Sequence, residues 1–184
     1  IVEPENIGDA DTLGEKELRT LEIVKAAIQN GERALIYTSW VRTDSQQKLK
    51  KLLADEGYRT EILTDKIKTT DREDWVQKKL AAGMQVLIVN PSLVETGLDL
   101  NAFTTLVFYS MGYKLFTLRQ ASRRSWRINQ KASAVKVYML YYEDTMQQKC
   151  LKLMASKLAV AGLIEGNFSE EGLAAMSDVQ DMTS

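Results

Sequence analysis

Short apolar runs, set between longer segments of helical periodicity, constrain this chain more than any other feature of its sequence. The strongest run is residues 85–90, in which the four central positions are Val, Leu, Ile and Val. Residues 33–38 and 104–109 are runs of the same kind. Apolar residues at consecutive positions over so short a length predict strands buried on both faces, as in a parallel sheet. Weaker signals at residues 59–63 and 133–140 predict two further strands.

The segments around these strands have the periodicity or the capping residues of helices. Strand and helix therefore alternate, which predicts an α/β fold whose mostly parallel sheet is covered by helices on both faces. Leu18 belongs to the apolar stripe of the first helix, and Trp75 is expected to lie in the core. The predicted helices are one over residues 15–30, one capped by Thr43 or Asp44, one opened by Thr70 or Asp71, a basic one over about residues 115–127 and a last one from Glu143 or Asp144. Gly31, Gly57 and Gly83 are expected to end the first three.

Charge is distributed unevenly along the 184 residues. Between Leu100 and Tyr142 there are seven basic residues and no acidic one, which leaves 17 basic against 25 acidic residues elsewhere. This distribution favours a local anion-binding patch over a general nucleic-acid coat, which a net charge of −1 also argues against. The length predicts one globular domain. We place it at residues 14–162, after an acidic lead-in at 1–13 and before an acidic tail at 163–184.

The composition excludes several classes of chemistry. There is no histidine, which removes the commonest metal ligand and general base, and the single cysteine, Cys150, excludes an internal disulfide. No metal site is therefore predicted. No apolar run approaches the roughly 18 to 20 residues that cross a bilayer, and the start lacks a signal pattern. The sequence predicts a soluble, cytoplasmic protein with no membrane partner.

The basic stretch contains four polar residues at helical spacing. Gln120, Arg124, Arg127 and Gln130 would project from one face of a helix. Two aligned guanidiniums with flanking amides fit an anion, and phosphate is the expected one. The alternative interpretation is a solvated basic helix face.

Polar residues also follow the predicted strands, where ligands gather in parallel sheets. Their side chains, and the main chain at Gly97, could approach a phosphate backbone. The alternative is that they only cap helices and form turns. The candidates are Thr38, Ser39 and Trp40 after one strand, and Asn90, Thr96, Gly97 and Asp99 after another.

Two segments resemble motifs of the Swi/Snf-like branch of superfamily-two helicases and translocases. The segment that resembles motif VI is Gln120-Ala121-x-x-Arg124-x-x-Arg127-Ile128-x-Gln130. Motif V is similar to Gly97-Leu98-Asp99-Leu100, preceded by Asn90-Pro91. Over about residues 15–162 the chain is similar to the second, C-terminal RecA-like lobe of such a protein, which implies a three-layer RecA-like domain. It departs from the branch at Val94, Glu95, Asp99, Arg123 and Asn129, and we expect a divergent member from a bacterium or mobile element.

The resemblance implies roles for these residues. Arg124 and Arg127 would be arginine fingers for the γ-phosphate of ATP, and Gln120 and Gln130 would fix their helix. Gly97 and Asp99 would lie near the ribose or couple the nucleotide to the nucleic acid. Mg²⁺ and most of the ATP would be bound by a separate N-terminal RecA-like lobe of the same parent protein. Thr38, Ser39, Asn90 and Thr96 would touch the backbone of a nucleic acid, expected to be double-stranded DNA, and Trp40 could stack on a base.

This chain lacks the other half of an ATPase site. It contains neither a Gly-x-x-x-x-Gly-Lys-Ser/Thr loop nor an Asp-Glu pair after a strand. We therefore expect the isolated domain not to hydrolyse ATP. Two alternatives stay open. One is a non-catalytic RecA-like module that binds nucleic acid or protein, and the other is an unrelated doubly wound phosphate-binding enzyme.

Overall fold

The computed structural model describes residues 13–38, 45–94, 98–110, 135–145, 148–149 and 152. The described residues up to Leu140 belong to one compact unit, and those from Tyr141 onward belong to a second. The predicted division into residues 1–13, 14–162 and 163–184 stays a prediction, because both ends of the chain lie outside the described residues.

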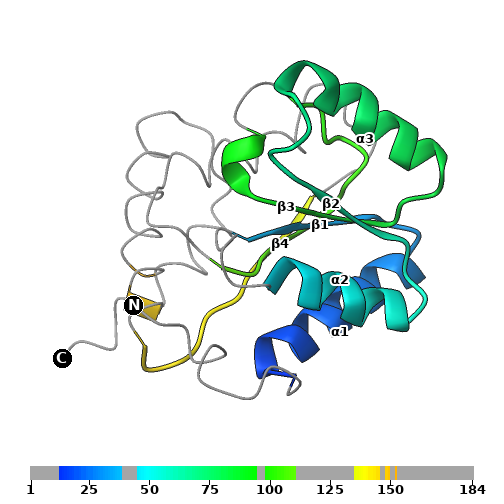
Figure 1. The fold of residues 1–184 in the computed structure, drawn as a ribbon. Coiled ribbons are helices and arrows are strands. Elements are labelled where there is room, and N and C mark those ends of the chain that lie inside the picture. The colour runs from blue at the N-terminus through cyan, green and yellow to red at the C-terminus, as the bar shows by residue number, and fades with distance from the viewer. Residues whose placement is uncertain are drawn as a thin grey trace, which may run out of the picture. The chain divides into compact units, whose positions relative to one another are not determined.

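Five parallel strands form the sheet of the first unit, in the order β2-β3-β1-β4-β5 (Figure 1). Each of the five predicted strands is present and is shorter than predicted. The strands are β1 Ala34–Tyr37, β2 Thr60–Leu63, β3 Val86–Val89, β4 Thr105–Phe108 and β5 Lys136–Met139.

Helices cover both faces of this sheet. Helices α1 (Glu15–Gln29) and α2 (Ser45–Asp55) lie on one face, and α3 (Arg72–Ala81) lies on the other (Figure 1). The expected three-layer α/β architecture is therefore confirmed. A short 3-10 helix, η2 (Thr69–Asp71), precedes α3, and another, η3 (Pro91–Leu93), follows β3.

The predicted helix ends are also confirmed for these three helices. Gly31, Gly57 and Gly83 have φ angles of 73°, 85° and 89°, which side chains other than glycine rarely adopt. Each glycine lies two residues beyond the last helical residue. A left-handed residue at that point turns the chain away from the helix and toward the next strand.

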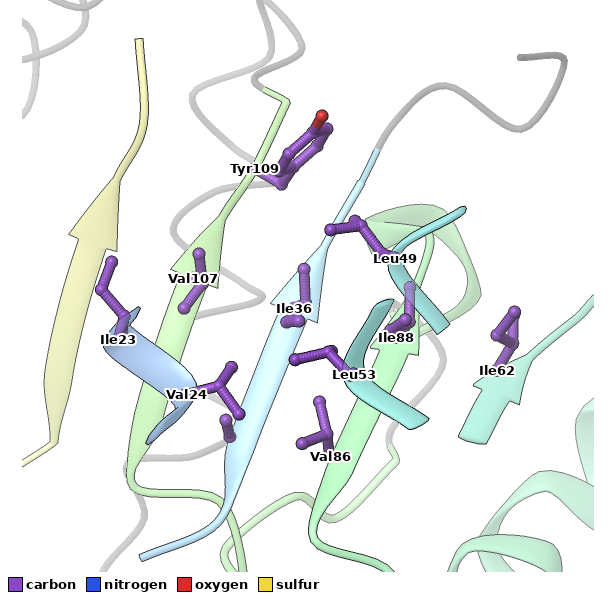
Figure 2. Close-up of a cluster of buried hydrophobic side chains, with 11 residues drawn as sticks. Ile23, Val24, Ile36, Leu49, Leu53, Ile62, Val86, Ile88, Val107 and Tyr109 are labelled. Atoms are coloured by element: carbon purple, nitrogen blue, oxygen red, sulfur yellow. The ribbon is translucent and has the colours of Figure 1, made fainter. Parts of the chain in front are cut away.

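A core cluster lies between the sheet and the α1–α2 layer. All four residues of β1 are completely buried, as a strand at the centre of a doubly covered sheet requires. Ile36 and the residues beside it on β3 and β4, Ile88 and Val107, face the helices (Figure 2). The alternate residues face the α3 side, where the rings of Tyr37 and Phe108 stack at a centroid distance of 4.9 Å.

Two apolar side chains are more exposed than the sequence predicts. Leu18 is 46% exposed, although it belongs to the apolar stripe of α1. Trp75 is only half-buried, and the Lys79 ammonium lies 5.6 Å from the centroid of its ring. The expectation that Trp75 is a core residue was wrong, because its ring stays partly exposed and lies against a cation of the same helix.

Strand β2, the outermost strand on one side of the described sheet, carries a charged side chain. Glu61 accepts hydrogen bonds from Lys50 of α2 at 3.2 Å and from Lys79 of α3 at 2.6 Å. Burial raises the pKa of Glu61, but the hydrogen bonds and charges of the two lysines outweigh it and leave the pKa below its ordinary value. Charge at this position joins helices from opposite faces of the sheet and discourages another strand from pairing with β2.

Replacing Glu61 by Gln should lower the free energy of unfolding by about 1 kcal/mol at pH 7. Because the folded-state pKa lies below that of the unfolded chain, the ion pairs stabilise the fold above the ordinary glutamate pKa of 4.5. This contribution is lost as the pH falls through the lowered pKa, so the cost of Glu61→Gln should shrink at about pH 3. Urea unfolding at the two pH values measures it.

The control is Glu22→Gln, which removes an exposed ion pair with Arg19 at 2.6 Å on α1. It should change the free energy of unfolding by less than about 0.5 kcal/mol at either pH. A cost of Glu61→Gln that is equal at both pH values would contradict the assignment.

The second unit contains few described residues. Residues 148, 149 and 152 are helical, in agreement with the last predicted helix. Asp144 has a φ angle of 56°, so it lies before the helix and not within it. The Lys149 amide donates to the Thr145 carbonyl at 3.3 Å, which is a bond of helical spacing.

Candidate functional site

The carboxyl ends of β1, β3 and β4 lie side by side. Tyr37, the last residue of β1, is in register with Val89 of β3 and Phe108 of β4. Thr38 and Asn90, which follow directly, therefore share one edge of the sheet, as the sequence predicts. Strand β1 lies between β3 and β4. The strand that follows β1 in the sequence, β2, lies on the β3 side, whereas the strand that follows β4, β5, lies on the opposite side. Such an edge is where ligands bind in open parallel sheets.

Thr38 is completely buried at this edge. Its amide donates to the Val89 carbonyl at 3.1 Å, and its hydroxyl accepts a hydrogen bond from the hydroxyl of Ser110 at 3.2 Å. The two hydroxyls join the ends of β1 and β4. Contact between Thr38 and a nucleic-acid backbone stays a prediction.

Asn90 caps the short helix η3. Its side-chain oxygen accepts hydrogen bonds from the Ser92 amide at 3.0 Å and from the Ser92 hydroxyl at 2.9 Å. Pro91, buried at the first position of η3, ends the strand as expected. Asn90 therefore caps the segment that follows β3, while its contact with nucleic acid stays a prediction.

Asp99 forms a turn further along the same connection between β3 and β4. Its carboxylate oxygens accept hydrogen bonds from the amide of Asn101 at 3.1 Å and from its side-chain nitrogen at 3.2 Å. This is an Asx turn, the alternative that the sequence left open. The carboxylate is partly exposed. It can accept a further hydrogen bond from a neutral hydroxyl such as that of a ribose, whereas it would repel a phosphate.

The start of α3 holds this connection, which sequence analysis missed. Arg72 is 9% exposed, and its guanidinium donates to the carbonyls of Ile67 at 3.2 Å and Leu93 at 3.0 Å. The carboxylate of Glu73 accepts a hydrogen bond from the Asp99 amide at 2.8 Å. The available signal was the arginine itself, because a cation in the first turn of a helix opposes the macrodipole and needs another reason to be there.

A buried charged group at the start of α1 was also missed. The Lys16 ammonium donates to the Tyr109 carbonyl at 3.4 Å, next to the carboxyl end of β4. The Glu17 carboxylate is 2% exposed and lies 3.5 Å from the Lys48 ammonium of α2. These contacts anchor α1 and α2 to the edge that carries the candidate site, and no local sequence pattern indicates them.

The remaining predicted site residues lie outside the described residues, and so does the predicted basic helix at residues 115–127. Their roles stay predictions. They are Ser39, Trp40, Thr96, Gly97, Gln120, Arg124, Arg127 and Gln130.

Neither a metal site nor a membrane span is found in the part of the chain that the structure describes. No group of three or more Cys, Asp or Glu side chains there could hold a metal ion, and histidine is absent from the sequence. Within the same residues, no helix combines the length and apolar character that crossing a bilayer demands.

Comparison with protein-family models identifies the chain. Residues 16–129 match the helicase conserved C-terminal domain. The chain belongs to this family. The match begins at Lys16, at the start of α1, and extends through the segment that contains Gln120, Arg124 and Arg127. It ends one residue before Gln130.

Two known proteins are similar to this helicase C-terminal domain. The ATP-dependent helicase fft3 of Schizosaccharomyces pombe is 23% identical over 148 residues, which cover 79% of this chain and 16% of that protein. The crystal structure of the C-terminal part of the Fun30 ATPase domain superposes with a TM-score of 0.70 at 19% identity, covering 80% of this chain and 47% of that one. This chain therefore spans a minor part of each.

The resemblance to the second RecA-like lobe of a Swi/Snf-like, superfamily-two helicase is thereby confirmed. The expected RecA-like fold is confirmed as well. The comparisons do not support the expected bacterial or mobile-element origin, since the similar helicase comes from fission yeast.

Proposed function

We propose that this helicase C-terminal domain is one half of a DNA-dependent ATPase that moves along nucleic acid. The observation that carries the proposal is the family match over residues 16–129, which includes both arginines of the motif VI segment. Among the described residues, β1, β3 and β4 of the parallel sheet end together at one edge, which supports the proposal. An N-terminal RecA-like lobe of the same protein supplies the phosphate-binding loop that this chain lacks.

Each proposed contact follows from the chemistry of the side chain. Arg124 and Arg127 carry fixed positive charge to the γ-phosphate, where charge stabilisation and positioning provide most of the catalysis. Their planar guanidiniums can contact two phosphate oxygens at once, which a lysine cannot. Asp99 accepts a hydrogen bond from the ribose. Its existing bonds to Asn101 hold the carboxylate in place for this contact.

ATP, when bound, supplies the phosphoanhydride whose hydrolysis releases the free energy for movement. In the proposed cycle, the closed arrangement brings Arg124 and Arg127 to the phosphates. The open arrangement lets residues of this lobe, including Asn90 and Thr96, move to a new position on the strand. Mg²⁺ belongs to the N-terminal lobe in this proposal.

The test is the ATPase rate of the full-length protein without nucleic acid and with double-stranded DNA, single-stranded DNA or RNA. Double-stranded DNA should give the largest stimulation. The 184-residue chain alone should not turn ATP over, because it lacks the phosphate loop. Turnover by the chain alone would overturn the half-site proposal, and equal rates with and without every nucleic acid would overturn the translocase proposal.

A second candidate is a RecA-like module that binds nucleic acid or protein without hydrolysis. The observation in its favour is that Thr38, Asn90 and Asp99 are each hydrogen-bonded within the domain. This candidate predicts binding to nucleic acid that ATP does not change. Measuring the affinity of the full-length protein for duplex DNA with and without a non-hydrolysable ATP analogue separates the two.

A further inference from the structure

The connection between β3 and β4 is held at two points by one turn of α3. The two points are Leu93 and Asp99. They lie on either side of residues 95–97, which are outside the described residues. Arg72 donates to the Leu93 carbonyl at 3.0 Å, and Glu73 accepts from the Asp99 amide at 2.8 Å. Two adjacent residues of a single helix therefore fix both flanks.

Arg72 and Glu73 each make two hydrogen bonds within the domain. Arg72 is 9% exposed and also donates to the Ile67 carbonyl at 3.2 Å, so its guanidinium is fixed from two sides. Hydrogen bonds from a charged, buried donor are stronger than those between neutral groups. Glu73 accepts a second bond from the Gln77 side chain at 3.3 Å, one helical turn further on. Both side chains are therefore held before any ligand binds.

The two flanks belong to different parts of the proposed site. Asn90 caps η3, the short helix that ends at Leu93, and is the proposed nucleic-acid contact. Asp99 is the proposed nucleotide contact. The turn of α3 that holds Leu93 and Asp99 therefore fixes the distance between the part of the connection assigned to nucleic acid and the part assigned to the nucleotide.

We propose that Arg72 and Glu73 are positioning residues that couple nucleic-acid binding to ATP turnover by holding the two flanks of the β3–β4 connection. The inference rests on the proposed function, since it assigns a use to Asn90 and Asp99. Neither Arg72 nor Glu73 touches the reacting groups in this account. Both act through the backbone of the residues that they hold.

The first measurement is hydrogen–deuterium exchange at the Asp99 amide in the full-length protein. Glu73→Ala removes the acceptor and should accelerate exchange about fivefold, as loss of one hydrogen bond predicts. Glu73→Gln keeps an oxygen that can accept the bond and should exchange at the wild-type rate. Asp74→Ala is the matched control, because Asp74 is an exposed acid in the same first turn of α3. In Asp74→Ala, the Asp99 amide should exchange at the wild-type rate.

The second measurement is the ATPase rate with and without duplex DNA. In Glu73→Ala, the ratio of the stimulated to the unstimulated rate should fall about tenfold or more, as small misplacements of a catalytic arrangement do. The unstimulated rate should change little. Glu73→Gln should restore the ratio. Arg72→Lys, which keeps the charge but loses the two-sided contact, should lower the ratio as well.

Three results would overturn the inference. They are unchanged exchange at Asp99 in Glu73→Ala, an unchanged rate ratio despite faster exchange, and failure of Glu73→Gln to restore either quantity. An equal loss of both rates would mean that Glu73 only stabilises the fold. If DNA does not stimulate the wild-type protein, the proposed function and the coupling role both fail, while exchange at Asp99 still shows whether Glu73 holds this amide.

Discussion

Alanine at Arg124 or Arg127 should lower the DNA-stimulated ATPase rate of the full-length protein by a factor of about a thousand or more. An arginine finger stabilises negative charge that develops on the transferring phosphoryl group. Its loss is therefore felt mainly in the transition state, so kcat should fall while the KM for ATP changes little. Steady-state kinetics at saturating duplex DNA measure both quantities.

Lysine is the more stringent test at these two positions. It keeps the positive charge but presents it as a point charge on a flexible stem, without the planar pair of donors. We expect Arg127→Lys to recover only a small part of the lost rate. Recovery to the wild-type rate would mean that local charge, and not the geometry of a guanidinium, is what this position supplies.

Arg119→Ala is the matched control for both arginines. It removes the same charge from the same basic stretch, but Arg119 lies outside the segment that resembles motif VI. Its effect should be confined to weaker DNA binding, which higher salt imitates. If Arg119→Ala, Arg124→Ala and Arg127→Ala lower the rate equally, the stretch acts as a diffuse basic patch and the finger assignment is wrong.

The strands were predictable because burial on both faces leaves a direct record in the sequence. Val86–Val89 has four apolar residues in a row because α1 and α2 cover one face and α3 covers the other. The helix ends were predictable for a local reason as well. A left-handed residue is needed after each helix, and Gly31, Gly57 and Gly83 supply it at little steric cost.

The burial of individual helix residues was less predictable. Lys16 and Glu17 are buried at the start of α1, whereas the neighbouring Leu18 is exposed. The reason lies far away in the chain, since Lys16 bonds to the carbonyl of Tyr109 and Glu17 faces Lys48 of α2. Helical periodicity describes which residues share a face, but it does not say which distant groups meet that face.

The candidate site was predictable only in outline. The rule that ligands meet the carboxyl ends of parallel strands correctly placed Thr38 and Asn90 on one edge. It did not indicate that Asn90 caps η3 or that Asp99 forms a turn with Asn101. It also gave no reason to consider Arg72 and Glu73, whose contacts cross 21 and 26 positions of sequence.

Replacing Ile36 by Ala should lower the free energy of unfolding by about 2 to 5 kcal/mol. Ile36 is completely buried on the central strand, with α1 and α2 packed over its face of the sheet (Figure 2). Truncation removes apolar contacts and leaves a cavity that β3 and β4 cannot close, because backbone hydrogen bonds fix both strands against β1. Urea unfolding of the 184-residue chain measures the change.

Ile36→Val separates lost volume from lost strand propensity. It keeps the β-branched shape that suits a strand and removes one methyl group, so its cost should be only about 0.5 to 1.5 kcal/mol. Val137→Ala on β5 is the surface control, because Val137 is 42% exposed, and it should change stability by about 0.5 kcal/mol or less. If Ile36→Ala costs no more than Val137→Ala, the α1–α2 layer is not packed on β1 in solution. The sheet edge that carries the candidate site would then lack its support.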